Sequence, residues 1–269
     1  MARQSSIFSK IVEIEESGNA GALCTVIASK GSTPRSTGAK MLVYPDGQFI
    51  GTVGGGELEN RVRKAAVDSI SNGRSTKLIY NMADATRGDP GICGGQVEVY
   101  VEPILPAPTL VVIGGGHVGK AVAHLAKWIG FKVVVSDDRP EFCTKKANPD
   151  ADVLLAISMS EIPKRLAITP QTYLVLTTRG TDIDVKGLPE LLKSPAAYIG
   201  VIGSRRRWMM TADRLLKEGV SKKVLQKVHS PIGLEIRAET PEEIAVSILS
   251  EIILLRNGGD GKSMKMNLK

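Results

Sequence analysis

The feature that most constrains the fold is a glycine-rich turn between an apolar run and a helical stretch. Residues 110–113 are apolar and lead directly into residues 114–119, Gly-Gly-Gly-His-Val-Gly. This is the GxGxxG pattern in the strand–turn–helix context of a dinucleotide-binding unit. Gly114 allows the tight turn, Gly116 lets the backbone approach a diphosphate, and Gly119 lets the helix pack on the strand. The pattern predicts a Rossmann-type domain with a phosphate-bearing ligand at the amino terminus of the helix.

An acidic residue follows where dinucleotide sites hold the ribose. A second apolar run ends at Asp137, roughly 20 residues beyond the motif, the spacing at which an acid binds the ribose hydroxyls. The neighbours Asp138 and Arg139 leave the choice between NAD and NADP open. The alternative interpretation is a Rossmann fold whose glycine loop binds no dinucleotide.

The rest of the C-terminal part alternates between short apolar runs and helical stretches. The runs are residues 109–113, 132–136, 153–156, 173–176 and 198–202. Such uninterrupted apolar runs are typical of parallel strands covered by helices on both faces. The last run leads into Gly203 and Ser204 before another helix. These two residues are either a second phosphate-binding turn or an ordinary turn.

The N-terminal part has short β-rich runs separated by glycine-rich loops. We expect strands over residues 22–28, 40–44, 48–53 and 97–102, and a helix over residues 57–71. Three prolines within residues 103–108 indicate a domain boundary. The predicted fold class is α/β, with a mixed α+β domain at residues 1–105 followed by a Rossmann-like parallel-sheet domain at residues 106–269.

Two loops of the N-terminal part are candidate anion-binding elements. The first is rich in turn-forming residues and carries Arg35. The second joins a strand to a helix through Gly54, Gly55 and Gly56, so its backbone amides can hold an anion. We predict that Arg35 and these three glycines contribute to cofactor binding.

A third loop holds the candidate reactive thiol. Cys93 lies beside Gly94 and Gly95, just before a predicted strand. Glycine lets other groups approach the backbone closely, and nearby helix amides favour the thiolate, which is a nucleophile and a soft-metal ligand. We predict Cys93 as a catalytic or metal-binding residue, and Gly94 and Gly95 as cofactor-binding residues. A buried structural cysteine is the alternative for Cys93, and it is our prediction for Cys24 and Cys143.

The composition narrows the class of protein. A net charge of +7 and a pI near 9.3 favour anionic partners, but the basic residues are dispersed, and an aromatic content of 4% disfavours nucleic-acid binding by base stacking. No stretch reaches the ~20 apolar residues of a membrane span, and the N-terminus lacks the apolar core of a signal peptide. Three widely spaced cysteines form neither a disulfide framework nor a closed zinc site. We therefore expect a cytoplasmic protein with reduced thiols and without nucleic-acid or membrane partners.

Several unusual strings occur in a fixed order over nearly the whole chain. They are Gly31-Ser-Thr-Pro34-Arg35, Gly51-Thr-Val-Gly-Gly-Gly56, Cys93-Gly-Gly-Gln-Val-Glu98, Ile113-Gly-Gly-Gly-His-Val-Gly119, Tyr198-Ile-Gly-Val-Ile-Gly-Ser204, Ser230-Pro-Ile-Gly-Leu234 and the stretch 238–248. With these strings the sequence resembles the xanthine dehydrogenase accessory factors of the XdhC/CoxF type.

The resemblance implies a function that the residues alone do not specify. Members of that family are chaperones that receive molybdenum cofactor, shield it, and help its sulfuration and its insertion into a xanthine dehydrogenase-type molybdenum hydroxylase. A cysteine desulfurase is then a second partner, and we expect a homodimer. The cofactor is a pterin phosphate, sometimes extended by a nucleotide. The glycine loops would take its phosphate, and Cys93 would lie near the metal or relay the sulfur.

Three positions depart from the family pattern, and two other functions stay open. Thr181 stands where relatives often have histidine, Arg237 where they often have glycine, and Glu57 where some have cysteine. An NAD(P)-dependent oxidoreductase would use the Rossmann motif, but it needs a proton donor at the nicotinamide, and the three histidines of the chain are in no obvious catalytic context. A relay protein would carry sulfur or metal on Cys93. We expect a chaperone without turnover chemistry.

Overall fold

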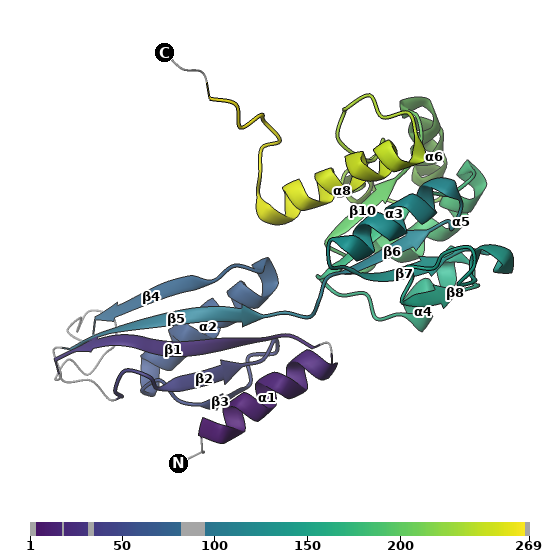
Figure 1. Cartoon of the computed structure of the whole chain (residues 1–269). Helices are drawn as coiled ribbons and strands as arrows, with labels where there is room; N and C mark the ends of the chain where they lie inside the picture. The colour runs from purple at the N-terminus through teal and green to yellow at the C-terminus, as the bar shows by residue number, and fades with distance from the viewer. Residues whose placement is uncertain (1–3, 18, 32–34, 82–94, 267–269) are drawn as a thin grey trace. The chain divides into compact units, whose positions relative to one another are not determined.

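The computed structural model describes residues 4–17, 19–31, 35–81 and 95–266. It divides the chain into two compact units, Met1–Pro106 and Ala107–Lys269 (Figure 1). The division lies within the proline-rich segment 103–108. In the described ranges, no helix has the length and the apolar character needed to cross a bilayer.

The N-terminal unit is built on an antiparallel sheet. Its elements are α1 (Gln4–Ser17), β1 (Gly21–Lys30), β2 (Lys40–Val43), β3 (Phe49–Gly51), α2 (Gly56–Asn72), β4 (Thr76–Asn81) and β5 (Gln96–Ile104). The strand order is β3-β2-β1-β5-β4, and each neighbouring pair is antiparallel. The edge strand β4 is not among the strands expected from the sequence. Its apolar residues, 78–80, are consecutive, so its sequence lacks the alternation of a half-buried strand, although only Tyr80 is buried and Leu78 is partly buried.

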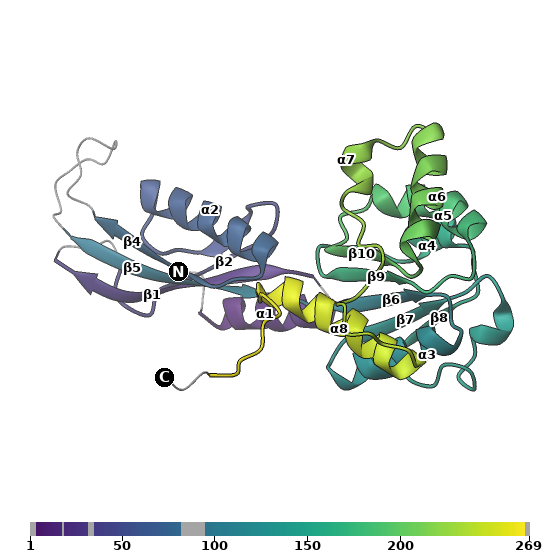
Figure 2. The same ribbon diagram turned by 90° about the horizontal axis from the view of Figure 1, so that it is seen from above.

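Helices α1 and α2 cover opposite faces of this sheet (Figure 2). Successive side chains of a strand point to opposite faces. Met41 therefore packs with Cys24 and with Leu58 of α2, while the next residue, Leu42, packs with Ile14 of α1. Each helix buries one apolar stripe, as expected for amphipathic helices on a sheet.

The C-terminal unit confirms the predicted Rossmann-like domain. Its strands are β6 (Thr109–Ile113), β7 (Lys132–Ser136), β8 (Val153–Leu155), β9 (Thr172–Leu176) and β10 (Tyr198–Val201), and its helices are α3 (His117–Trp128), α4 (Ile162–Arg165), α5 (Thr181–Leu192), α6 (Arg205–Lys217), α7 (Lys222–Leu225) and α8 (Pro241–Asn257). All neighbouring strands are parallel, in the order β10-β9-β6-β7-β8. Counted from β6, this is the Rossmann order 3-2-1-4-5.

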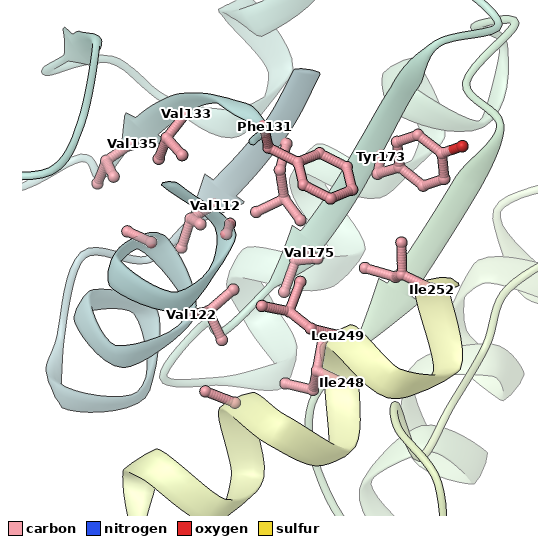
Figure 3. Close-up of a cluster of buried hydrophobic side chains, with 14 of the residues drawn as sticks. Val112, Val122, Phe131, Val133, Val135, Tyr173, Val175, Ile248, Leu249 and Ile252 are labelled. Atoms are coloured by element: carbon pink, nitrogen blue, oxygen red, sulfur yellow. The ribbon is translucent and has the colours of Figure 1, made fainter. Parts of the chain in front are cut away.

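Both faces of the parallel sheet are buried. Val112 and Val175 point to the face covered by α3 and α8, where they pack with Val122 and Ile248 (Figure 3). Val111 points to the opposite face, which α4, α5, α6 and α7 cover (Figure 2). Burial on both faces explains why these strands are continuous apolar runs in the sequence.

The strand order determines where a crevice forms at the edge of the sheet. The chain leaves β6 for β7 on one side, and β9 lies on the other side of β6. The loops that follow β6 and β9 therefore diverge at the carboxyl ends of two adjacent strands. In open α/β sheets this switch point is where ligands bind.

Candidate functional site

A pocket lies at the carboxyl ends of β6, β7 and β9. The loops after these strands form its walls, together with side chains from the segment after β8 and from α5. Its glycine and polar lining residues are Gly114, Gly116, Ser136, Asp137, Asp138, Arg139, Thr177, Thr178 and Arg179. Of the predicted site residues, the structure thus brings Gly114, Gly116 and Asp137 together around one cavity.

The glycines of the motif are required for different reasons. Gly114 has φ +113°, and a Cβ there would lie 2.6 Å from the carbonyl oxygen of Thr177. A Cβ on Gly119 would lie 1.9 Å from the carbonyl oxygen of Gly114. The protein's own backbone therefore excludes side chains at 114 and 119. Gly116 has φ −70°, which any residue adopts, and no described atom lies within 4 Å of a Cβ built on it. The space at Gly116 is open toward the pocket.

The carboxylate of Asp137 is held by groups of the protein itself. Its side chain is 2% exposed. Oδ2 accepts hydrogen bonds of 2.9 Å from the amide of Gly115 and from Nη2 of Arg139, and Oδ1 accepts bonds from the amide and Nε of Arg139 at 3.0 and 2.9 Å. The bond to Asp137 raises the pKa of Arg139. Because Arg139 is 34% exposed, removing it should cost less than the about 3–5 kcal/mol of a fully buried pair. Asp137 as a ribose-binding residue stays a prediction, and its oxygens already have donors.

A second ion pair joins the loops on either side of the glycine loop. Arg179, which follows β9, donates from Nη1 and Nη2 to the two carboxylate oxygens of Asp138, which follows β7, at 2.7 and 2.9 Å. The bonds from Arg179 lower the pKa of Asp138 to about 2. Both side chains are exposed, 48% for the arginine and 43% for the aspartate, and exposed pairs contribute only about 0–1 kcal/mol. Sequence reasoning did not identify this pair, because its partners are 41 residues apart.

One buried polar atom of the pocket has no partner. Ser136, the last residue of β7, is 0% exposed, and its Oγ lacks a hydrogen-bond partner among the described residues. An unsatisfied buried hydroxyl costs about 1–3 kcal/mol. A ligand oxygen in the pocket would satisfy it. The signal in the sequence is a serine that ends an otherwise valine-rich strand, and Ser136 is not among the predicted site residues.

A buried network supports the loop that carries Arg179. Asp184 of α5 is 0% exposed and accepts a bond from the hydroxyl of Thr178. Arg207 of α6 donates from Nη2 to Asp184 Oδ2 at 2.6 Å and from Nη1 to the carbonyl oxygen of Thr178 at 3.0 Å. The network therefore fixes both the backbone and the side chain of the residue that precedes Arg179.

The predicted turn at Gly203 and Ser204 lies outside this pocket. Ser204 is the N-cap of α6, and its Oγ accepts a bond from the amide of Arg207 at 3.2 Å. Gly203 lines a different hollow together with Arg205 and Arg237. Arg237 has φ +57°, the left-handed conformation that glycine adopts most easily. A glycine would adopt this conformation more easily than the arginine does.

The glycine loop of the N-terminal unit already holds a carboxylate of the chain. Glu59 Oε1 accepts bonds from the amides of Gly55 and Val53 at 2.9 and 3.3 Å, and a further bond from the hydroxyl of Thr52. The predicted anion-binding amides thus have an internal anion. Arg35 is exposed in the segment before β2. The roles of Arg35, Gly54, Gly55 and Gly56 in cofactor binding stay predictions.

We expect Glu59→Ala to lower the free energy of unfolding of the N-terminal unit by about 1–2 kcal/mol, because the amides of Gly55 and Val53 lose their acceptor. Urea denaturation followed by circular dichroism measures this. Glu57→Ala is the matched control: it removes a carboxylate that pairs with Arg61 at 3.1 Å on the surface of α2, and it should cost less than about 0.5 kcal/mol. Equal effects of the two substitutions would contradict the role of Glu59 in the loop.

The described thiols are poor nucleophiles. Cys24 is 0% exposed, and burial raises its pKa to about 12, which confirms the prediction of a buried structural cysteine. Burial also raises the pKa of Cys143, whose Sγ donates to the carbonyl oxygen of Leu155 at 3.2 Å. Cys93 and Gly94 lie outside the described residues, whereas Gly95 is buried immediately before β5. In the described part of the chain, no group of three or more His, Cys, Asp and Glu side chains is arranged to hold a metal ion.

Several proteins are similar in sequence to this chain. The E. coli K12 protein named "Uncharacterized protein YqeB" is 34% identical over 265 residues, covering 96% of the chain and 48% of the relative. A Bacillus subtilis 168 protein, named as a probable xanthine dehydrogenase subunit, is 35% identical over 159 residues, covering 59% and 46%. "Molybdenum cofactor insertion chaperone PaoD" of E. coli K12 is 22% identical over 282 residues, covering 91% and 86%. The chain spans about half the length of the first two relatives.

A solved structure has a similar fold, and two family patterns match the sequence. The structure, described as a xanthine dehydrogenase from Bacillus halodurans, is 22% identical with a TM-score of 0.51, covering 95% of this chain and 97% of its own. Residues 14–81 match the XdhC and CoxI family. Residues 110–252, more than half of the chain, match the XdhC Rossmann domain. The chain therefore belongs to the XdhC family.

Proposed function

We propose that this protein is an accessory factor that binds molybdenum cofactor and helps its insertion into a xanthine dehydrogenase-type molybdenum hydroxylase. The proposal is supported by membership of the XdhC family and by the names of two relatives, a molybdenum cofactor insertion chaperone and a probable component of a xanthine dehydrogenase. The cofactor is the cargo of the protein in this proposal, so binding and release are its tasks.

The observation that carries the proposal to this chain is the open space at Gly116. The other two glycines of the motif are explained by contacts within the protein, whereas Gly116 has an ordinary φ and no neighbour for a Cβ among the described atoms. Gly116, the N-cap of α3, and Ser136, whose buried hydroxyl is unpaired among the described residues, line the same pocket. These donors fit a phosphate, which the pterin cofactor carries, and the helix dipole favours its negative charge.

The finer parts of the proposal rest on the sequence. Cys93 would lie near the metal or relay sulfur supplied by a cysteine desulfurase, and a homodimer would present the docking surface for the hydroxylase. Both thiols of the described residues have raised pKa values, which favours Cys93 for this chemistry.

Anaerobic equilibrium binding of molybdenum cofactor, with NAD and NADP as competitors, tests the proposal. We expect the wild type to bind the cofactor and Cys93→Ser to bind it more weakly. Cys143→Ser is the matched control, since it replaces a thiol of raised pKa by another hydrogen-bond donor and should leave binding unchanged. Binding of NAD or NADP without binding of the cofactor would overturn the proposal in favour of an NAD(P)-dependent oxidoreductase.

A further inference from the structure

The two carboxylates that line the pocket already have hydrogen-bond donors from the protein. The oxygens of Asp137 accept four bonds from Gly115 and Arg139, and those of Asp138 are bound by Arg179. The free groups are the amides at the start of α3 and the hydroxyl of Ser136, which is 0% exposed and unpaired among the described residues. A ribose needs an acceptor for its hydroxyls, whereas a phosphate supplies acceptors only. The pocket is therefore suited to the phosphate end of a ligand.

The two arginines of the pocket differ in how firmly they are held. Arg139 is bound to a carboxylate that is 2% exposed and that also holds the glycine loop through the amide of Gly115. Withdrawing Arg139 would leave a buried charge unpaired, which is strongly unfavourable. Arg179 and Asp138 are about half exposed, and a surface pair of this kind contributes little to stability. Nη1 of Arg179 also lies 4.0 Å from Oδ1 of Asp137, at the limit of an ion pair. Arg179 can therefore exchange its partner at small cost, and Arg139 cannot.

The position of the exposed pair brings Arg179 close to the glycine loop. Asp138 follows β7 and Arg179 follows β9, and the strand between them, β6, ends in the glycine loop. Both side chains line the same pocket as Gly116 and Ser136. A guanidinium forms paired bonds to carboxylates and to phosphates with the same geometry. A phosphate bound at Gly116 would thus compete with Asp138 for Arg179.

We propose that Arg179 is the anion-recognising side chain of this pocket, and that Asp138 is an internal competitor which a phosphomonoester or diphosphate group displaces. The inference rests on the proposed function only in that both require a phosphate-bearing ligand in the pocket. On binding, Arg179 leaves Asp138 for the ligand phosphate, and Arg139 keeps its bonds to Asp137. The affinity for phosphate then depends on how much more strongly Arg179 interacts with the phosphate than with Asp138.

A double-mutant cycle on the full chain tests this proposal. Isothermal titration calorimetry measures the binding of ADP, the phosphate-bearing probe, and of adenosine, which lacks the phosphates. We expect Arg179→Gln to weaken ADP binding at least ~10-fold, the value of a charge-assisted bond, and Asp138→Asn to strengthen it about 2–5-fold. In the Arg179→Gln background, Asp138→Asn should not increase the affinity for ADP, because Asp138 competes with the phosphate only for Arg179. Adenosine binding should be the same in all variants.

The control pair is Asp213 and Lys217 of α6, which are joined at 2.7 Å on the surface and do not line the pocket. Asp213→Asn and Lys217→Gln change the net charge in the same way and should leave ADP affinity unchanged. If Asp138→Asn increased the ADP affinity equally with and without Arg179, the proposal would be overturned, since Asp138 would then act by repelling the phosphate charge. Absence of ADP binding in the wild type would also overturn it. If the ADP cycle behaves as expected but molybdenum cofactor does not bind, only the proposed function fails.

Discussion

Gly119→Ala is expected to lower the free energy of unfolding of the C-terminal unit by about 3 kcal/mol or more, at the upper end of the cost of overpacking. A Cβ at this position would lie 1.9 Å from the carbonyl oxygen of Gly114 and 2.9 Å from Oγ1 of Thr177. The first of these atoms is backbone and belongs to a tight turn with φ +113°. Thr177 Oγ1 is fixed by its own bond to Gly114 at 2.7 Å. Relief therefore requires α3 to move away from β6.

Gly116→Ala is the matched control for this substitution, because the same methyl group meets no described atom within 4 Å. Alanine is a poorer N-cap than glycine, so stability should fall by about 1 kcal/mol. Ligand binding should fall in this variant, since the methyl occupies the space next to the phosphate. Urea denaturation followed by circular dichroism and titration with ADP measure the two effects. Equal destabilisation by both substitutions would contradict the distinction between a packing glycine and a ligand-facing glycine.

Local pattern was sufficient to predict the C-terminal unit but not the contacts that its glycines make. Residues 110–119 predicted β6, the turn and the start of α3, because a strand, a turn and a helix each leave a short-range signal. The motif predicted a separate role for each of Gly114, Gly116 and Gly119. It could not show the part of Thr177, which limits the space at Gly114 and Gly119 and is brought close only when β9 pairs with β6.

The polar contacts of the pocket could not be predicted for the same reason. The spacing of Asp137 indicates a ribose-binding acid, but the residue two positions further on, Arg139, binds both of its oxygens. Arg179 has no local feature that marks it as a site residue. Its partner, Asp138, comes from another strand end, so the pair exists only in the folded sheet. Long-range ion pairs leave no periodic signal in a single sequence.

The edge strand β4 was missed by the sequence analysis for a different reason. Its residues Thr76–Asn81 pair with β5 along their whole length. The strand is nevertheless mostly exposed, including Ile79 at 51%. Its three apolar residues, 78–80, are consecutive, so the sequence does not alternate between apolar and polar residues. Pairing with β5 and the packing of Leu78 and Tyr80 on the core become visible only in the fold.

Asp184→Ala is the second substitution for which we expect a large effect, a loss of about 3–5 kcal/mol in the free energy of unfolding of the C-terminal unit. Asp184 is 0% exposed and accepts a bond of 2.6 Å from Arg207. Without this carboxylate, the guanidinium of Arg207 loses its counter-charge, and its side chain is only 22% exposed. Its Nε already lacks a partner among the described residues, so the desolvated charge would be poorly compensated.

The hydrogen bonds around Asp184 should also affect ligand binding. Arg207 holds the carbonyl oxygen of Thr178, which directly precedes Arg179. We therefore expect Asp184→Asn, which keeps the shape and removes the charge, to weaken ADP binding as well as stability. Asp182→Asn is the control: it removes an exposed carboxylate of the same helix, paired with Arg214 at 2.6 Å, and should change neither the urea midpoint nor the ADP affinity. If Asp184→Asn lowered the midpoint but bound ADP as tightly as the wild type, the network would support α5 and α6 without positioning Arg179.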